Sequence, residues 1–138
     1  MSRVSETLAE YTRADALADG ALVDCSALAQ TAGFCWPVAV TQAVWNVITD
    51  IPPTNHVLQD VDGRLWEVLT TASQQALIHP NTPVCHFTVR LLHSGGHSLA
   101  CKLVAHPGDR GEPVVTILLP SEAITNNYET GESYGHDD

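Results

Sequence analysis

The chain has 138 residues, of which 44% are hydrophobic and 16% charged, which is enough for one domain with one hydrophobic core. Sixteen acidic residues against six basic ones give a formal net charge of -10. A surface with this charge repels nucleic acid and anionic membranes, and it attracts basic proteins at long range. We therefore expect no direct nucleic-acid binding and no membrane association.

The acidity is concentrated toward the C-terminus. Residues 121–138 contain five acidic residues and neither Lys nor Arg. This composition predicts one domain over residues 1–120, followed by a flexible acidic tail over residues 121–138. The N-terminal residues lack the apolar core of a signal peptide, and the uncharged stretch 25–49 contains Gly, Pro and amide side chains that do not suit a membrane span. We expect a cytoplasmic protein.

The first half of the chain is predicted to be helical. Thr12 and Asp15 have the spacing of a capping box, and a glycine follows at position 20, which predicts a short helix over residues 13–19. Ser26 is the expected N-cap of a second helix, over residues 27–32.

Two longer helices are expected to follow. Pro37 suits the first turn of a helix in which apolar residues recur at steps of three and four up to Ile48. Asp62 is the predicted N-cap of a helix over residues 63–78, which has an apolar stripe on one side. The three tryptophans are expected to be core anchors. They are Trp36, Trp45 and Trp66.

The period of the hydrophobic pattern changes to two after residue 83. Alternating residues predict strands over 84–92, 98–105 and 113–120, with short turns between them. Consecutive strands joined by short turns favour an antiparallel meander. The predicted fold class is therefore α+β, with a helical N-terminal half packed on a three-stranded antiparallel β-meander in the C-terminal half.

Cys35 is the residue that most resembles a catalytic nucleophile. It precedes Trp36 at the start of a predicted helix, as in papain-like proteases, and a helix N-terminus lowers the pKa of a thiol. A nucleophile also needs a histidine, for which His86 on the polar face of a predicted strand is the first candidate and His79, His93 and His97 are the others. The preceding cysteine of the protease signature is Ala32 here, and Pro37 removes a backbone donor. We predict that the chain is not an enzyme, and a cysteine-dependent enzyme centred on Cys35 and His86 is kept as an alternative.

Zinc binding, by a module that includes Cys35 and His86, belongs to the same alternative. His93, His97 and Cys101 are spaced four apart, with Cys85 nearby in the sequence. Glycines break any helix between the two histidines, and positions four apart in a strand are roughly 13 Å apart, too far for one ion. We therefore predict no metal site and no cofactor.

Three blocks of the sequence resemble an uncharacterised family of small proteins carried by bacteria, phages and plasmids. They are TRADALADGALVDCSALAQTAGFCWPVAVTQAVW, DVDGRLWEVLTTA and GEPVVTILLP. The family pattern around the first block is similar to G-F-x-W-P-V-A-x-T, often with a basic residue where Cys35 stands. The resemblance implies that the fold does not require a thiol at this position. It carries over no catalytic residue, since the family has no established activity.

The resemblance also implies an accessory protein of a mobile element, acting in the cytoplasm of a bacterial host. Small acidic proteins of such elements often inhibit host defence by occupying a basic nucleic-acid-binding surface, as anti-CRISPR proteins do. With the charge of -10, this predicts a non-enzymatic inhibitor that binds a basic host protein, such as a CRISPR effector subunit. A structural plasmid or phage protein, with a homo-oligomeric interface at an edge strand, is a further alternative. The residues predicted to contact the partner are Asp15, Asp19, Asp24, Asp60, Asp62, Glu67, Asp109 and Glu112.

Overall fold

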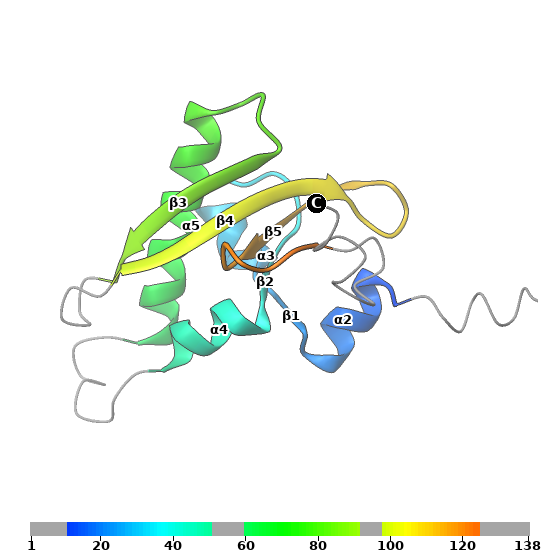
Figure 1. The fold of residues 1–138 in the computed structure, drawn as a ribbon, viewed down its shortest axis with the longest axis horizontal. Coiled ribbons are helices and arrows are strands. Elements are labelled where there is room, and N and C mark those ends of the chain that lie inside the picture. The colour runs from blue at the N-terminus through cyan, green and yellow to red at the C-terminus, as the bar shows by residue number, and fades with distance from the viewer. Residues whose placement is uncertain (1–10, 51–59, 92–97, 125–138) are drawn as a thin grey trace, which may run out of the picture.

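The computed structural model describes residues 11–50, 60–91 and 98–124, and it combines one β-sheet with several helices (Figure 1). In chain order the elements are α2 (Arg13–Asp19), β1 (Leu22–Asp24), α3 (Ser26–Thr31), β2 (Val38–Thr41), α4 (Gln42–Thr49), α5 (Val61–Ile78), β3 (Val84–Arg90), β4 (Ser98–Pro107) and β5 (Pro113–Leu118). The strands form a five-stranded mixed sheet in the order β1-β2-β5-β4-β3. Strands β2 and β5 are parallel, and the other neighbours are antiparallel.

The prediction of a three-stranded antiparallel meander beneath a helical N-terminal half is wrong. The C-terminal strands β3, β4 and β5 do pair antiparallel, but the N-terminal half contributes β1 and β2 to the same sheet. The helix expected from Pro37 does not begin there, since β2 comes first and α4 begins at Gln42. All four residues of β2 are buried. A strand covered on both faces has a continuous apolar run instead of an alternating one, so periodicity alone does not separate it from a buried helix.

The predictions for α2 are confirmed. Thr12 Oγ1 accepts a hydrogen bond from the Asp15 amide at 3.0 Å, and the Asp15 carboxylate accepts one from the Thr12 amide at 3.2 Å. Gly20 ends the helix in the left-handed conformation, with φ of 90°. Helix α5 begins two residues before its predicted start, because its N-cap is Asp60, whose carboxylate accepts from the Gly63 amide at 2.7 Å.

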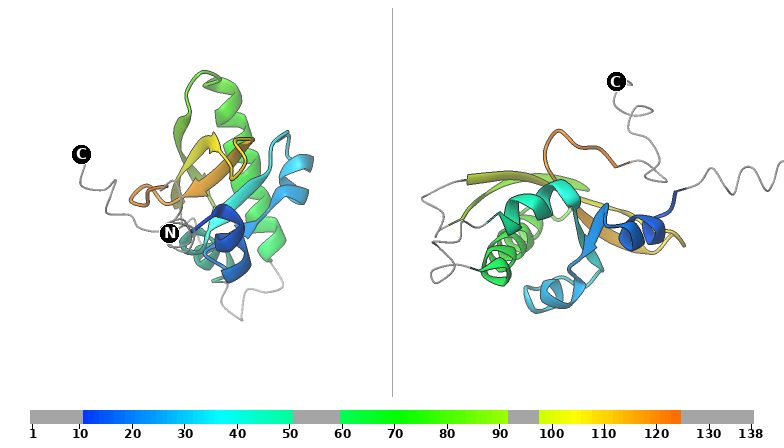
Figure 2. Two further views of the ribbon diagram at one scale, coloured as in Figure 1. Left: turned by 90° about the vertical axis from the view of Figure 1, so that its right-hand side faces the viewer. Right: turned by 90° about the horizontal axis from the view of Figure 1, so that it is seen from below.

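The main core lies between one face of the sheet and helices α3, α4 and α5. We call this face the inner face. The strand residues that it contributes to the core are Val38, Val40, Cys85, Phe87, Val89, Leu99, Cys101, Leu103, Val115 and Ile117. Helices α3 and α5 lie on this side of the sheet in the right-hand view of Figure 2. The buried aliphatic side chains of α4 and α5 complete the core.

Helix α5 is fixed to α4 by a buried arginine. Arg64 donates from Nη1 to the carbonyls of Val47 at 3.1 Å and Asp50 at 3.2 Å, at the C-terminal end of α4. These contacts satisfy carbonyls that a helix end leaves without partners inside the helix. No helix in the described ranges is long and apolar enough to cross a membrane.

The opposite, outer face of the sheet is covered unevenly. Helix α2 packs on it through a small cluster of Ala16, Leu22 and Ala39. The segment 119–124 follows β5 and lies on the side of the sheet opposite to α5 (Figure 2). Within this segment, Glu122 accepts hydrogen bonds from Thr41 Oγ1 at 2.6 Å and from a nearby backbone amide at 2.8 Å. Glu122 was assigned to the predicted tail, and the rest of that tail from residue 125 lies outside the described residues.

Candidate functional site

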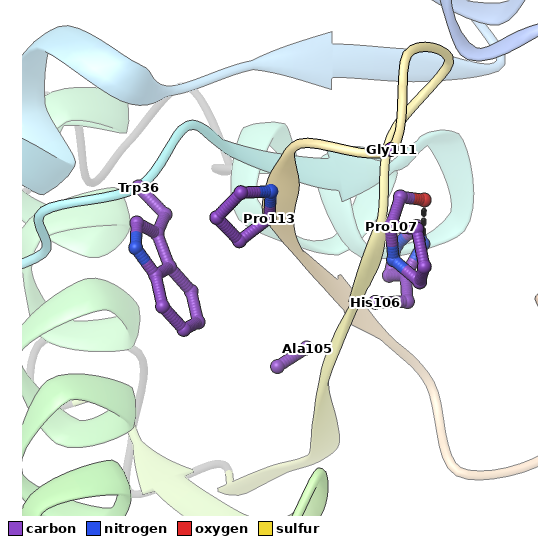
Figure 3. Close-up of a pocket in the computed structure, with 6 residues that line it drawn as sticks. All are labelled: Trp36, Ala105, His106, Pro107, Gly111 and Pro113. Atoms are coloured by element: carbon purple, nitrogen blue, oxygen red, sulfur yellow. Dashed lines mark hydrogen bonds between the residues drawn. The ribbon is translucent and has the colours of Figure 1, made fainter.

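An open hollow lies beside Trp36. It has a volume of about 250 Å³ and opens to solvent. Its lining comes from the segment before β2 and from the β4–β5 hairpin, and consists of Trp36, Ala105, His106, Pro107, Gly111 and Pro113. Figure 3 shows the indole of Trp36 and the ring of Pro113 on the same side of β4. The Trp36 side chain is 47% exposed. We call this hollow the Trp36 pocket.

Backbone contacts hold Trp36 in this position. The carbonyl of Pro37, the next residue, accepts a hydrogen bond from the Val115 amide at 2.9 Å, which places the segment beside the start of β5. On the other side of Trp36, Gly33 ends the α3 region with a positive φ of 114°, and a Cβ there would lie 2.9 Å from Ser73 Oγ on α5. The segment that presents Trp36 is thus fixed at both ends.

The prediction that all the tryptophans are core anchors is wrong for two of them. Trp45 packs against the core, but Trp36 is 47% exposed and Trp66 on α5 is 38% exposed. A large exposed aromatic side chain is typical of interaction surfaces, where it contributes contact area with few rotatable bonds.

Exposed aliphatic side chains lie at the C-terminal end of α5. Leu77 and Ile78, at the end of α5, are 78% and 62% exposed. A short turn joins this helix to β3, and within it the Pro83 carbonyl accepts from the amide of Ala105 at 2.8 Å. Because Ala105 also lines the pocket, the pocket and the apolar end of α5 lie at the same end of the molecule.

One residue of the pocket lining, His106, directs its side chain to the other side of β4, where it joins a partly buried hydrogen-bond network (Figure 3). His106 Nε2 lies 2.8 Å from Thr116 Oγ1, and His106 Nδ1 lies 3.0 Å from the Pro107 carbonyl. Arg13 of α2 donates to the same Thr116 oxygen at 2.7 Å. A carbonyl can only accept, so Nδ1 carries the hydrogen, and Nε2 accepts from the threonine hydroxyl.

This arrangement holds His106 in the neutral form. Burial lowers the pKa of the imidazole below its ordinary value, and the nearby positive charge of Arg13 lowers it further. Protonation would place a second donor against a Thr116 oxygen that already accepts from the guanidinium. His106 is therefore a structural residue at the contact between α2 and the sheet, and it is not a proton donor at neutral pH.

Most of the carboxylates predicted to contact a partner also stabilise the fold. Six of the eight accept hydrogen bonds from nearby groups of their own chain. These are Asp15, Asp19, Asp24, Asp60, Asp109 and Glu112. The carboxylates of Asp62 and Glu67 make no hydrogen bond or ion pair within the described residues, and the two residues lie on α5 on either side of Trp66 in the sequence.

The hydrogen bonds of Asp19 change the pKa of its carboxyl group. Its carboxylate accepts from the Tyr11 hydroxyl and from the Ala21 amide, and these bonds lower its pKa. Burial and the Asp19 charge raise the pKa of Tyr11 to about 12. Asp19 therefore stays ionised, but one of its oxygens is already committed to the tyrosine.

Three of the predicted carboxylates lie on two segments that contact each other, the first turn of α2 and the β4–β5 turn. Asp109, in the β4–β5 turn, accepts from the amides of Arg13 and Ala14 at 2.8 and 2.9 Å, and so caps the N-terminus of α2. Asp15 lies in the first turn of the same helix, and Glu112 lies in the same β4–β5 turn next to Pro113. We call Asp15, Asp109 and Glu112 the acidic corner. Asp24, Asp60, Asp62 and Glu67 lie on other elements.

The comparisons with known proteins give a family. Residues 2–123 match the model of a family of unknown function, DUF6573. The chain belongs to this family. The resemblance to an uncharacterised family is thereby confirmed. No match was found among the curated proteins, and none was found among the solved structures.

In this DUF6573 member, the candidate catalytic pair is not assembled. Cys35 is exposed in the segment between α3 and β2, and His86 is exposed on β3, where it pairs with Lys102 of β4. Neither side chain makes a hydrogen bond within the described residues. Among the residues that the structure describes, no base is hydrogen-bonded to the Cys35 thiol.

The residues considered for zinc are also separated where the structure shows them. Cys85 and Cys101 are buried on the inner face, whereas His86 of the same strand is exposed on the outer face. His93 and His97 lie outside the described residues. Over residues 11–50, 60–91 and 98–124, no cluster of three His, Cys, Asp or Glu side chains has the geometry to hold a metal ion.

Sequence reasoning missed the pocket and the buried network behind it. Only one local signal pointed toward the pocket, namely an aromatic residue next to a proline in a segment without charges. The residues beside Arg13 in the sequence give no sign that its side chain is buried against β5. Both features depend on elements far apart in the sequence.

Proposed function

We propose that this protein acts as a non-enzymatic binding module whose contact surface is centred on the Trp36 pocket. The observation that carries the proposal is the half-exposed Trp36 indole beside an open hollow of about 250 Å³. Exposed aromatic side chains at hollows are the groups that most often dominate binding energy at protein interfaces. The exposed end of α5 extends the apolar area.

The partner is a protein that carries basic residues beside apolar ones. Two residues of the acidic corner, Asp109 and Glu112, lie in the β4–β5 turn that also supplies Gly111 and Pro113 to the pocket, and the net charge of -10 attracts a basic surface from a distance. An arginine or lysine that enters the pocket would meet the face of Trp36, an arrangement that is favourable by about 0.5–2 kcal/mol. The neighbouring carboxylates would neutralise further basic residues at the rim.

The proposal extends to the identity of the partner and the cell compartment in which it is bound. The resemblance to proteins of phages and plasmids supports a role in the bacterial cytoplasm, where the partner would be a host-defence protein and the contact would cover its basic nucleic-acid-binding surface. The acidic surface supports such a role, because it imitates the charge of nucleic acid. A CRISPR effector subunit is one partner of this chemistry.

The experiment is affinity capture from bacterial host lysate with the tagged wild-type protein and with Trp36→Ser. Trp66→Ser is the matched control, since Trp66 is also exposed but lies on α5 away from the pocket residues. We expect the wild type and Trp66→Ser to retain the same partner, and Trp36→Ser to lose it. Capture should weaken steeply as salt is raised. Equal retention by Trp36→Ser would refute the proposed surface.

A further variant separates binding from the cysteine-dependent alternative. Cys35→Ala removes the thiol and leaves Trp36 in place. We expect this variant to capture the partner as the wild type does. If Cys35→Ala captured the partner normally but no longer inhibited the activity of that partner, the result would instead support thiol chemistry.

A further inference from the structure

The two edges of the sheet differ greatly in length. Strand β1 forms one edge with three residues and ends at Asp24. Strand β3 forms the other edge with seven residues, and in the described part of the chain only β4 pairs with it. Short edge strands are protected against pairing with another chain, but long ones are not.

The direction of the free backbone groups on β3 follows from one hydrogen bond. The amide of Ala105 donates to the carbonyl of Pro83, so these two residues form a hydrogen-bonded pair. Pairs in an antiparallel ladder alternate between hydrogen-bonded and non-hydrogen-bonded. With Val84 opposite Val104, the residues that bond to β4 are Cys85, Phe87 and Val89. The residues whose N–H and C=O groups point away from β4, to the free edge, are Val84, His86, Thr88 and Arg90.

Apart from the charge of Arg90, strand β3 lacks the features that normally prevent edge pairing. Its residues 84–90 include no proline, aspartate or glutamate, and the pairing with β4 runs residue for residue without a bulge. The four residues with outward backbone groups are also the four with exposed side chains. A regular, accessible edge of this length is a template for another strand.

We propose that β3 pairs antiparallel with β3 of a second copy of this chain, about a two-fold axis at Phe87. In this register Val84 faces Arg90 of the second copy, and His86 faces Thr88 of the second copy. Each of the four outward-pointing residues then forms a hydrogen-bonded pair with a residue of the second copy. The two residues of each pair are joined by two backbone hydrogen bonds. The two sheets become one continuous sheet across the axis.

The charge of this edge permits a second copy to bind. Two molecules with a net charge of -10 repel each other through most of their surfaces, but β3 presents no carboxylate. The two-fold register also sets Arg90 against the apolar Val84, so no like charges lie directly opposite each other. Added salt screens the remaining repulsion, so the dimer is expected to become stronger as salt is raised. This salt dependence is opposite to that of the proposed basic partner.

The first test is sedimentation equilibrium over a concentration series. Thr88→Pro removes an outward-pointing N–H without removing a bond to β4, and an edge strand tolerates such a proline. Thr88→Ala keeps the N–H and is the matched control. We expect the wild type and Thr88→Ala to form dimers, and Thr88→Pro to remain monomeric with an unchanged circular dichroism spectrum. A wild type that is monomeric throughout the series would overturn the proposal and leave the edge to a different partner.

Hydrogen exchange measured residue by residue tests the register without any variant. The outward amides of His86, Thr88 and Arg90 should be protected at dimer concentrations and exchange rapidly after dilution. The amides of Phe87 and Val89 should be protected at both concentrations. Equal exchange of the outward amides at both concentrations would contradict pairing at this edge. Trp36→Ser should dimerise like the wild type, so failure of the pocket proposal leaves this one intact.

Discussion

Arg13 at the start of α2 and Thr116 in β5 are joined by a buried hydrogen bond of 2.7 Å. The second guanidinium nitrogen of Arg13 donates to the Val115 carbonyl at 3.1 Å. Thr116 is completely buried, and only 6% of Arg13 is exposed. The charged side chain thus connects α2 to a strand in the middle of the sheet, and its loss would leave buried acceptors without this donor.

Replacement of Arg13 by methionine tests this connection. Hydrogen bonds to charged groups contribute more than neutral ones, so Arg13→Met should lower the free energy of unfolding by about 2 kcal/mol. Arg110→Met is the control, because Arg110 is exposed on the β4–β5 hairpin and its loss should cost less than about 0.5 kcal/mol. Urea unfolding followed by circular dichroism measures both values. Equal midpoints for the two variants would show that the buried contact does not stabilise the fold.

The pH dependence of stability should report on His106. Its folded-state pKa is lowered below the ordinary value of 6.5, first by burial and then by Arg13 of α2. The unfolded chain therefore binds the proton more readily, and the stability due to the neutral imidazole is present above pH 6.5 and lost as the pH falls through the folded-state pKa. Between pH 7 and the mildly acidic range, we expect the melting temperature of the wild type to fall.

His106→Gln supplies the comparison for this prediction. Glutamine keeps a hydrogen-bonding side chain but does not titrate. Its melting temperature should decrease less than that of the wild type over the same pH interval, whatever its stability at pH 7. An equally steep decrease in both proteins would assign the pH dependence to other groups.

Local signals in the sequence predicted the elements that depend on local interactions. The capping box of Thr12 and Asp15 defines α2 within the first turn, and the hydrophobic alternation of β3 and β4 reflects one buried and one exposed face. These features require only neighbours a few residues away.

Features that depend on distant contacts were not predictable in this way. Strand β2 is buried on both faces because β5, far along the chain, pairs with it in parallel. Its continuous apolar run also fits a helix. The exposure of Trp36 depends on the same pairing, since the Pro37 carbonyl bonds to Val115. The acidic residues could be recognised as charges, but their roles as caps, as for Asp109, appear only after folding.

A substitution at Gly33 tests how the Trp36 segment is held. Gly33→Ala introduces a side chain at a positive φ of 114° and places its Cβ 2.9 Å from Ser73 Oγ. We expect a loss of about 1–3 kcal/mol in the free energy of unfolding, which is typical for such backbone strain. The double variant Gly33→Ala/Ser73→Gly removes the contact and should recover part of the loss beyond additivity. Strict additivity in chemical denaturation would show that the approach to Ser73 is not restrictive.

The four cysteines should differ sharply in reactivity. Cys35 is exposed, whereas Cys25, Cys85 and Cys101 are buried. Burial raises the pKa of Cys25 to about 11 and that of Cys101 to about 12, so both stay in the unreactive thiol form at mildly alkaline pH. A disulfide reagent should therefore label one thiol rapidly in the native protein, and all four after denaturation. Cys35→Ser should abolish the rapid phase and leave three thiols in denaturant. Rapid labelling that persists in Cys35→Ser would mean that a core strand or the β1–α3 junction opens far more readily than its packing indicates.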